Sequence, residues 1–341
     1  MTTANSALAS LSSAGSATLL HEYKVVLIDM AILLFGWTVT RLPRRLRQPL
    51  AWTVTVLGVA ITDAVTVREP AVWRMWLLVG VLFLGMKSIV VATVDWKVMG
   101  FAAWLRFACL WFGMRPDVFE HGEGRAGPAH DAIPMATRGA ARVVAGMLLM
   151  TVGASTIRQG VQAVMPALAM PVATIAVLAG FSIAMHFGVM DVVTGYWRLH
   201  GYSRCRAMFR QPWKATSLRD FWGVRWNAAF TEMTAITVVR PLQERLGPAG
   251  AMMAGFAVSG LLHEVALSLP VHAGPGHPTA YFLIQGALVA VEDRLRRAGV
   301  LARVPASVRS AAVLVCVIAP TPILLTRPFL AQIVWPIAGI R

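Results

Sequence analysis

Long apolar stretches recur along this chain of 341 residues and constrain its fold more than any other feature. A helix needs about 20 predominantly apolar residues to cross the ~30 Å hydrocarbon core of a bilayer. Because 57% of the side chains are hydrophobic and only 14% are charged, we exclude a soluble domain of this size. We predict an all-helical, polytopic membrane bundle of about eight spans. The expected spans are 24–40, 49–67, 74–94, 139–157, 172–194, 249–269, 279–293 and 310–326.

The basic residues indicate how these spans are oriented. Most of the 31 Lys and Arg lie in four clusters, at 41–47, 97–142, 198–225 and 294–309. Cytoplasmic loops carry an excess of Lys and Arg, so we place these clusters inside and the amino terminus outside. The net charge of +15 therefore reflects membrane topology, and we expect no nucleic-acid partner.

Segment 228–239 is apolar, but we expect that it does not cross the membrane. It is short, it contains Glu232, and it ends before Arg240-Pro241. If it crossed, the last basic cluster would lie outside, against the charge rule. We predict a re-entrant or interfacial helix here.

We expect the whole chain to form one domain preceded by a tail. Residues 1–22, rich in Ser, Ala and Thr, are expected to form a disordered tail, and residues 23–341 a single membrane-embedded domain. The three cysteines lie far apart without CxxC spacing, which indicates neither a disulfide framework nor a metal site.

An ionisable side chain, His263, lies well inside the expected span 249–269. At 1.5 Å per residue it is roughly 20 Å from the cytoplasmic start of that helix. A buried imidazole in a bilayer is costly, so it marks a candidate functional site. The alternative is a structural histidine that is hydrogen-bonded between helices. His186, at a similar depth in span 172–194, is the rival candidate.

Segment 211–227 precedes the short apolar segment and combines three tryptophans and a phenylalanine with several cations. This amphipathic composition is typical of a backbone at the boundary between water and lipid. Asn227 would then lie at the mouth of the bundle, although an asparagine in this setting is also a common helix cap. Asp220 is expected to hold the loop through an ion pair with a neighbouring arginine.

The run Ser217-Leu-Arg-Asp-Phe-Trp-Gly-Val-Arg-Trp-Asn227 resembles the S-L-x-D-F-W-G-R-R-W-N signature of plant-type wax synthases, a branch of the membrane-bound O-acyltransferase family. In that family a helix with S-G-x-x-H-E follows, and here Ser259-Gly-Leu-Leu-His263-Glu264 follows 36 residues after Asn227. The next helix of the family, F-x-x-x-G and then E, is similar to 282–292. The resemblance covers 211–292. It departs at Val224, where Arg is usual, and at Gln285, where His is frequent.

The resemblance implies the family's helical membrane fold and transfer of an acyl group from acyl-CoA to an alcohol. His263 would be the general base that takes the hydroxyl proton. Asn227 would be a neutral donor to the oxyanion or hydroxyl. Glu264 and Asp220 would orient the surroundings, and no metal or cofactor beyond the co-substrate acyl-CoA is expected. The remaining residues implied in substrate or phosphate binding are Trp222, Trp226, Lys214, Arg219, Arg225, Ser259 and Gln285.

Two alternatives remain open at this point. The acceptor could be a natural-product or sugar hydroxyl with a short acyl-CoA as donor. The chain could instead be a proton-coupled transporter, with a relay formed by His263, His186, Asp29, Asp63 and Lys87.

The expected partners are acyl-CoA, a lipophilic alcohol and membrane lipid, whereas the acyl length and the oligomeric state are left open. Among the basic residues, 27 are Arg and 4 are Lys. This preference for Arg, with abundant Ala and Gly, indicates a genome rich in G and C, and hence a bacterial cytoplasmic membrane as the expected location.

Overall fold

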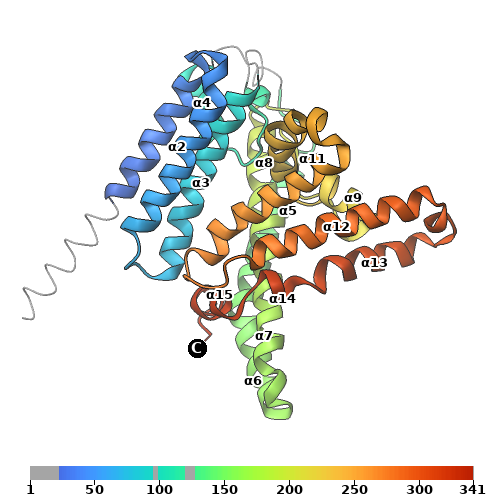
Figure 1. Ribbon diagram of the computed structural model, residues 1–341. Coiled ribbons are helices and arrows are strands. Elements are labelled where there is room, and N and C mark those ends of the chain that lie inside the picture. The colour runs from blue at the N-terminus through green and yellow to red at the C-terminus, as the bar shows by residue number, and fades with distance from the viewer. Residues whose placement is uncertain (1–22, 95–98, 120–126, 341) are drawn as a thin grey trace, which may run out of the picture. The chain divides into compact units, whose positions relative to one another are not determined.

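The computed structural model describes residues 23–94, 99–119 and 127–340, and every regular element within these ranges is a helix (Figure 1). The all-helical class predicted from the apolar stretches is thereby confirmed, while the expected tail at 1–22 lies outside the described residues. Seven helices in these ranges have the length and composition to cross a membrane. They are Tyr23–Arg41, Arg44–Val65, Ala71–Thr93, Ala132–Val164, Pro166–Leu199, Ala228–Ser268 and Ala306–Leu324.

The structure thus differs from the sequence prediction by one span. The expected span 279–293 lies within α12 (His277–Arg297), which is a helix but is not among the seven. The reason is the carboxyl-terminal end of α12, where Glu292, Asp293 and three arginines interrupt the apolar pattern.

The chain divides into two compact units, one ending at Val98 and one starting at Met99, and each is described by itself. The single domain expected for 23–341 therefore stays a prediction. The first unit contains helix Tyr23–Arg41, α2 (Arg44–Val65) and α3 (Ala71–Thr93).

Polar side chains of the first unit are buried between its helices. Asp63 forms an ion pair with Arg74, whose side chain is buried. Lys87 is completely buried, and its amine lies 4.9 Å from the centroid of the Phe83 ring. Asp63 is thus paired with Arg74, a residue that the proposed transporter relay does not include.

The second unit begins with α4 (Phe101–Cys109) and then forms a long helical hairpin. One arm contains α5 (Ala132–Leu148) and α6 (Ala154–Val164), and the other contains α7 (Pro166–Phe181) and α8 (Met190–Leu199). Glycines let the two backbones touch, because a Cβ atom on Gly146 would lie 2.5 Å from the Gly180 carbonyl oxygen. A salt bridge of 2.6 Å joins Arg142 to the buried Asp191 across the same contact.

A second hairpin carries the residues of interest. Its first limb, residues 228–246, starts with α10 (Ala228–Thr234) and continues into α11 (Arg240–His263). Gly247, at φ 67° and ψ 170°, breaks the helix, and the second limb, residues 248–268, returns. A Cβ atom on Gly255 would lie 3.1 Å from Val239, although a straight helix would separate the two by about 24 Å. The limbs are therefore antiparallel. The predicted re-entrant segment 228–239 lies in the first limb, and its depth in a membrane stays a prediction.

Helix α12 packs antiparallel to the second limb. A Cβ atom on Gly260 would lie 2.6 Å from the Thr279 Cα atom, and one on Gly286 would lie 2.9 Å from the Met253 sulfur. The next helix, α13 (Ala306–Ile318), runs back along α12 (Figure 1), and Tyr281 donates a hydrogen bond of 3.0 Å to the carbonyl of Val317. The short helices α14 (Thr321–Leu324), α15 (Arg327–Phe329) and α16 (Trp335–Ile337) end the described chain.

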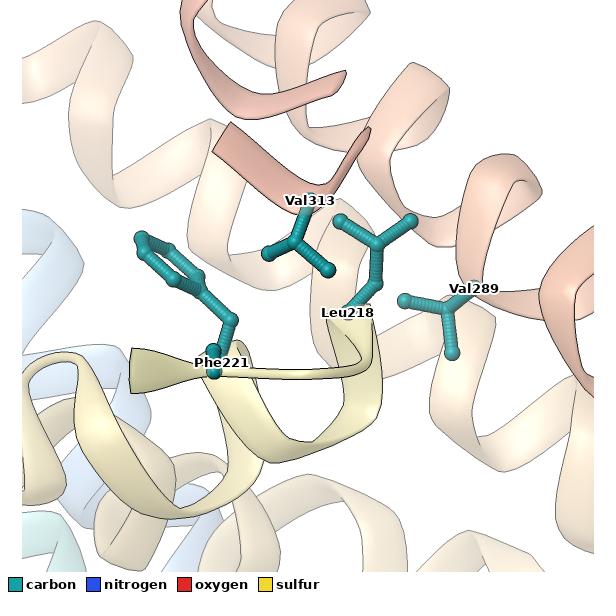
Figure 2. Packing of buried hydrophobic residues seen from close by; sticks show 5 residues of the cluster. Leu218, Phe221, Val289 and Val313 are labelled. Carbon is teal, nitrogen blue, oxygen red and sulfur yellow. The ribbon is translucent and has the colours of Figure 1, made fainter. Parts of the chain in front are cut away.

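A compact apolar cluster joins segment 211–227 to these two helices. Figure 2 shows Leu218 and Phe221 of that segment packed against Val289 of α12 and Val313 of α13. All four side chains are at most 3% exposed, so the cluster fixes the amphipathic segment against the helix pair. This contact places the tryptophan-rich segment beside the second hairpin.

Candidate active site

A cavity of about 680 Å³ lies between the two limbs of the second hairpin, α12 and the end of segment 211–227. Its walls are mostly apolar, with a few polar groups, as is usual for a site that holds a small molecule. Six of the residues selected from the sequence line it: Arg219, Trp222, Trp226, Asn227, Ser259 and His263. Five do not: Lys214, Asp220, Arg225, Glu264 and Gln285.

His263 lies near the end of the second limb, and its ring orientation is fixed on two sides. Its Nδ1 atom lies 2.7 Å from the carbonyl oxygen of Ser259, one helical turn earlier. A carbonyl can only accept, so Nδ1–H is the donor and Nε2 keeps its lone pair in the neutral ring. The ring centroid lies 4.3 Å from that of Phe282 and 5.3 Å from that of Phe230. A cavity-lining imidazole with a free basic nitrogen is suited to take a proton.

Asn227 precedes the first limb and caps its first helix. Its φ of 46° is left-handed, a conformation that asparagine tolerates better than most residues, and its Oδ1 atom accepts from the Phe230 backbone N–H at 3.3 Å. It is therefore the helix cap that the sequence offered as the alternative. Because the cap uses only the oxygen, the amide NH₂ of this cavity-lining side chain can still donate.

Several residues of the recognised motif shape the loop. Ser217 caps the short helix α9 (Leu218–Asp220) by accepting from the Asp220 N–H at 2.9 Å. The expected ion pair of Asp220 forms with Arg225, at 2.6 Å. Arg225 also donates to the carbonyl of Arg210 at 3.3 Å, so its guanidinium serves the loop and does not line the cavity.

Glu292 links the motif to α12. Both of its carboxylate oxygens accept from the Leu218 backbone N–H, at 3.0 and 2.8 Å. Backbone donors at the start of a helix have no intrahelical partner, so a carboxylate placed there satisfies them. The contact joins motif 217–227 to segment 282–292, and the distance between them in the sequence does not predict that they touch.

Removing this contact gives a first prediction. We expect Glu292→Ala to lower the free energy of unfolding by about 1–3 kcal/mol, because the N–H of the buried Leu218 loses its acceptor. Glu292→Gln, which keeps one oxygen acceptor, should lose less. Thermal unfolding of the purified protein in detergent measures both, and equal stability of all three proteins would contradict the assigned role.

Glu264 contacts the start of α12 and does not line the cavity. Its Oε1 atom accepts from the Thr279 N–H at 3.0 Å and from the Thr279 hydroxyl at 2.8 Å. It therefore lies beside His263 in sequence but faces the neighbouring helix, which it ties to the second limb.

One end of the cavity is cationic. Arg219, Arg294 and Arg297 line it there, together with Asp293, which pairs with Arg219. Arg294 and Arg297 are exposed, and neither has an ion-pair partner among the described residues. Of the three cations expected from the sequence to bind phosphate, Arg219 lines the cavity, whereas Lys214 and Arg225 do not; Arg294 and Arg297 were not expected. Arg294 and Arg297 follow Ala290, which also lines the cavity, by four and seven residues, and this spacing places all three on one face of α12.

The cationic end and the imidazole are separated by an apolar stretch. From Phe282, which contacts His263, to Arg297 the chain advances 15 residues along α12, or about 22 Å. Between these ends lie Met252, Phe256, Val289 and Ala290.

The rival histidine lies elsewhere in the second unit. His186 has its Nδ1 atom 3.0 Å from the Ser182 hydroxyl, and its ring packs against Phe209 and Trp226. It is not among the residues that line the cavity, although Trp226 is.

Residues 205–284 match the membrane bound O-acyl transferase family. The matched region contains the motif, both limbs and His263, which confirms the resemblance recognised from the sequence.

The chain is also similar to several curated plant proteins. It is 37% identical over 99 residues to the long-chain-alcohol O-fatty-acyltransferase of Simmondsia chinensis, covering 26% of this chain and 28% of that protein. It is 38% identical over 99 residues to the probable long-chain-alcohol O-fatty-acyltransferase 1 of Arabidopsis thaliana (26% and 29%), and 35% identical over 97 residues to the acyl-CoA–sterol O-acyltransferase 1 of the same plant (26% and 28%). The chain thus spans less than a third of the length of these relatives.

Proposed function

We propose that this protein transfers an acyl group from acyl-CoA to the hydroxyl of a hydrophobic alcohol and so forms an ester. The observation that carries the proposal is the hydrogen bond from His263 Nδ1–H to the Ser259 carbonyl, which leaves Nε2 as the basic atom of a cavity-lining ring. Catalysis by a positioned base of this kind is the usual way to activate a hydroxyl at neutral pH.

The reaction can be written with these groups. The alcohol oxygen attacks the thioester carbonyl carbon while its proton passes to His263 Nε2. The Asn227 NH₂ donates to the oxyanion that develops on the carbonyl oxygen. The carbon–sulfur bond then breaks, and the proton moves from Nε2 to the sulfur, so that the products are the ester and free CoA.

The dimensions of the cavity support a CoA thioester as donor. A phosphopantetheine arm has about as many chain bonds as five residues, so it reaches roughly 17 Å when extended. With a phosphate at Arg294, which lies 12 residues or about 18 Å beyond Phe282 along α12, this arm would bring the thioester close to His263.

The acceptor and the location are part of the same proposal. The printed names of the relatives include a long-chain alcohol and a sterol as acceptors, and the apolar walls of the cavity are compatible with such hydrophobic alcohols. The seven candidate spans support a multi-pass membrane protein, which we assign to a bacterial cytoplasmic membrane.

The direct test uses the purified full-length chain in lipid vesicles. With radiolabelled long-chain acyl-CoA and a long-chain primary alcohol, we expect labelled ester and an equal amount of free CoA. Short acyl donors and sugar acceptors, tested in parallel, address the alternative acceptor class. A proton-coupled transporter would release no CoA, and such a result would refute the proposal.

The cationic end yields a prediction for donor binding. Replacing Arg294 and Arg297 together by Gln should raise the KM for acyl-CoA by about tenfold or more with little change in kcat, because charge-assisted bonds to phosphate are lost. The matched control is Arg296→Gln, since Arg296 lies between them but pairs with Asp293 and does not line the cavity. Steady-state kinetics would contradict the assignment if the control and the double variant had the same KM.

A further inference from the structure

Trp222, on the cavity wall, is held from behind by a completely buried amide. Its indole Nε1–H donates to Gln285 Oε1 at 3.2 Å, and Gln285 Nε2 donates to the carbonyl of Cys316 at 3.0 Å. Gln285 has 0% exposure and does not line the cavity. One neutral side chain on α12 thus uses its donor and its acceptor together to fix the indole relative to α13.

The fixed indole borders the route to the imidazole. The Trp222 ring centroid lies 5.8 Å from Phe282 and 6.1 Å from Phe256, and Phe282 in turn lies 4.3 Å from His263. Gln285 lies about one helical turn from Phe282 on the side of the cationic end. Trp222 therefore flanks the part of the cavity just before His263, where the donor thioester would lie.

We infer that Gln285 is a positioning residue: by locking the indole of Trp222, it fixes the wall that places the thioester carbonyl and excludes water from it. This inference rests on the proposed acyl transfer.

If this inference holds, the wall decides which of two acceptors attacks the thioester, the alcohol or water. In transfer, the alcohol oxygen bonds to the carbonyl carbon, the carbon–sulfur bond breaks, and CoA leaves with the alcohol proton. In hydrolysis, water takes the place of the alcohol and the product is the free fatty acid. Because a loosened wall misplaces the thioester and admits water, it should lower transfer and favour hydrolysis.

The chemistry of the contact selects the variants. Gln285→Met keeps the length of the side chain, but its thioether is only a weak acceptor for the indole N–H and has no N–H group to donate to Cys316. Gln285→His restores both, because a neutral imidazole offers one donor and one acceptor. Trp222→Phe keeps an aromatic wall but removes the indole N–H.

The experiment measures the ratio of ester to free fatty acid formed from labelled acyl-CoA at a saturating alcohol concentration. This ratio does not depend on how much of the protein is folded. We expect Gln285→Met to lower both the ratio and kcat by about tenfold, with a smaller change in the KM for acyl-CoA. Gln285→His should recover most of the ratio. Trp222→Phe should resemble Gln285→Met, and the ester-to-acid ratio of the double variant should be no lower than that of either single variant, because both changes break the same Trp222–Gln285 hydrogen bond.

Tyr281→Phe is the matched control, because it removes a buried hydrogen bond between α12 and α13 to the carbonyl next to that of Cys316, but Tyr281 does not line the cavity. It should keep the wild-type ratio. A wild-type ratio in Gln285→Met, or an equal fall in Tyr281→Phe, would overturn the inference while the proposed function stands. Absence of ester from the wild-type protein would instead refute the proposed function.

Discussion

Replacing His263 by Ala should lower ester formation by roughly 10²–10⁴-fold at saturating substrates, the range expected when a general base is removed. The loss should appear in kcat, because the imidazole acts on the proton that moves during attack and not on donor binding. The KM for acyl-CoA should change little, since the cationic end of the cavity is about 22 Å away along α12. Initial rates of CoA release in vesicles measure both constants.

The control for this prediction is His186→Ala. It also removes a histidine from an apolar environment in the second unit, but His186 does not line the cavity. We expect it to reduce activity far less than His263→Ala. If His263→Ala folds, stays in the membrane and still makes ester at the wild-type rate, His263 is not the base. If His186→Ala alone abolishes activity, the rival histidine takes its place.

The second large effect is expected for Asn227→Asp. An aspartate tolerates the left-handed backbone and can still accept from the Phe230 N–H, so the cap and the fold should persist. It lacks the NH₂ group and adds a negative charge beside a developing oxyanion. We expect kcat to fall by about 10²–10³-fold, as when one donor of an oxyanion hole is lost.

Asn227→Gly separates the two roles of this residue. Glycine adopts the left-handed conformation freely and costs little as a cap, but it offers no side-chain donor. Both variants should therefore unfold close to the wild-type temperature and lose activity. Full activity in either variant would mean that Asn227 is only a helix cap.

The sequence predicted the helices well because apolar length is a local property. The span 172–194, for example, lies within Pro166–Leu199, and the short segment 228–239 does begin a separate limb. Segment 279–293 is a helix, as expected, but it is not a candidate membrane span, because the charged residues at the end of α12 interrupt its apolar pattern. The reversal at Gly247-Pro248 carries a strong local signal and could have been predicted from the sequence.

The site was only partly predictable, because its polar contacts join distant segments. His263 was chosen for its depth in an apolar helix, and the cavity that it lines depends on the contact between α12 and the second limb. In the sequence, Arg294 and Arg297 look like any other arginines of a cytoplasmic cluster. Only the structure shows that they lie on the face of α12 that lines the cavity and that Arg296 does not. The resemblance implies Gln285 as a substrate contact, whereas the structure places it behind Trp222.

The antiparallel hairpin has a consequence for how relatives of this protein can diverge. His263 and Asn227 belong to its open end, whereas Gln243 and Pro248, near the reversal, line the opposite end of the same cavity. If the donor carries an arm of constant length, inserting a helical turn into either limb would move the reacting atoms out of its reach. Extra residues at Gly247 would leave that spacing intact. Natural variation in length should therefore concentrate at the reversal and be absent from the two limbs.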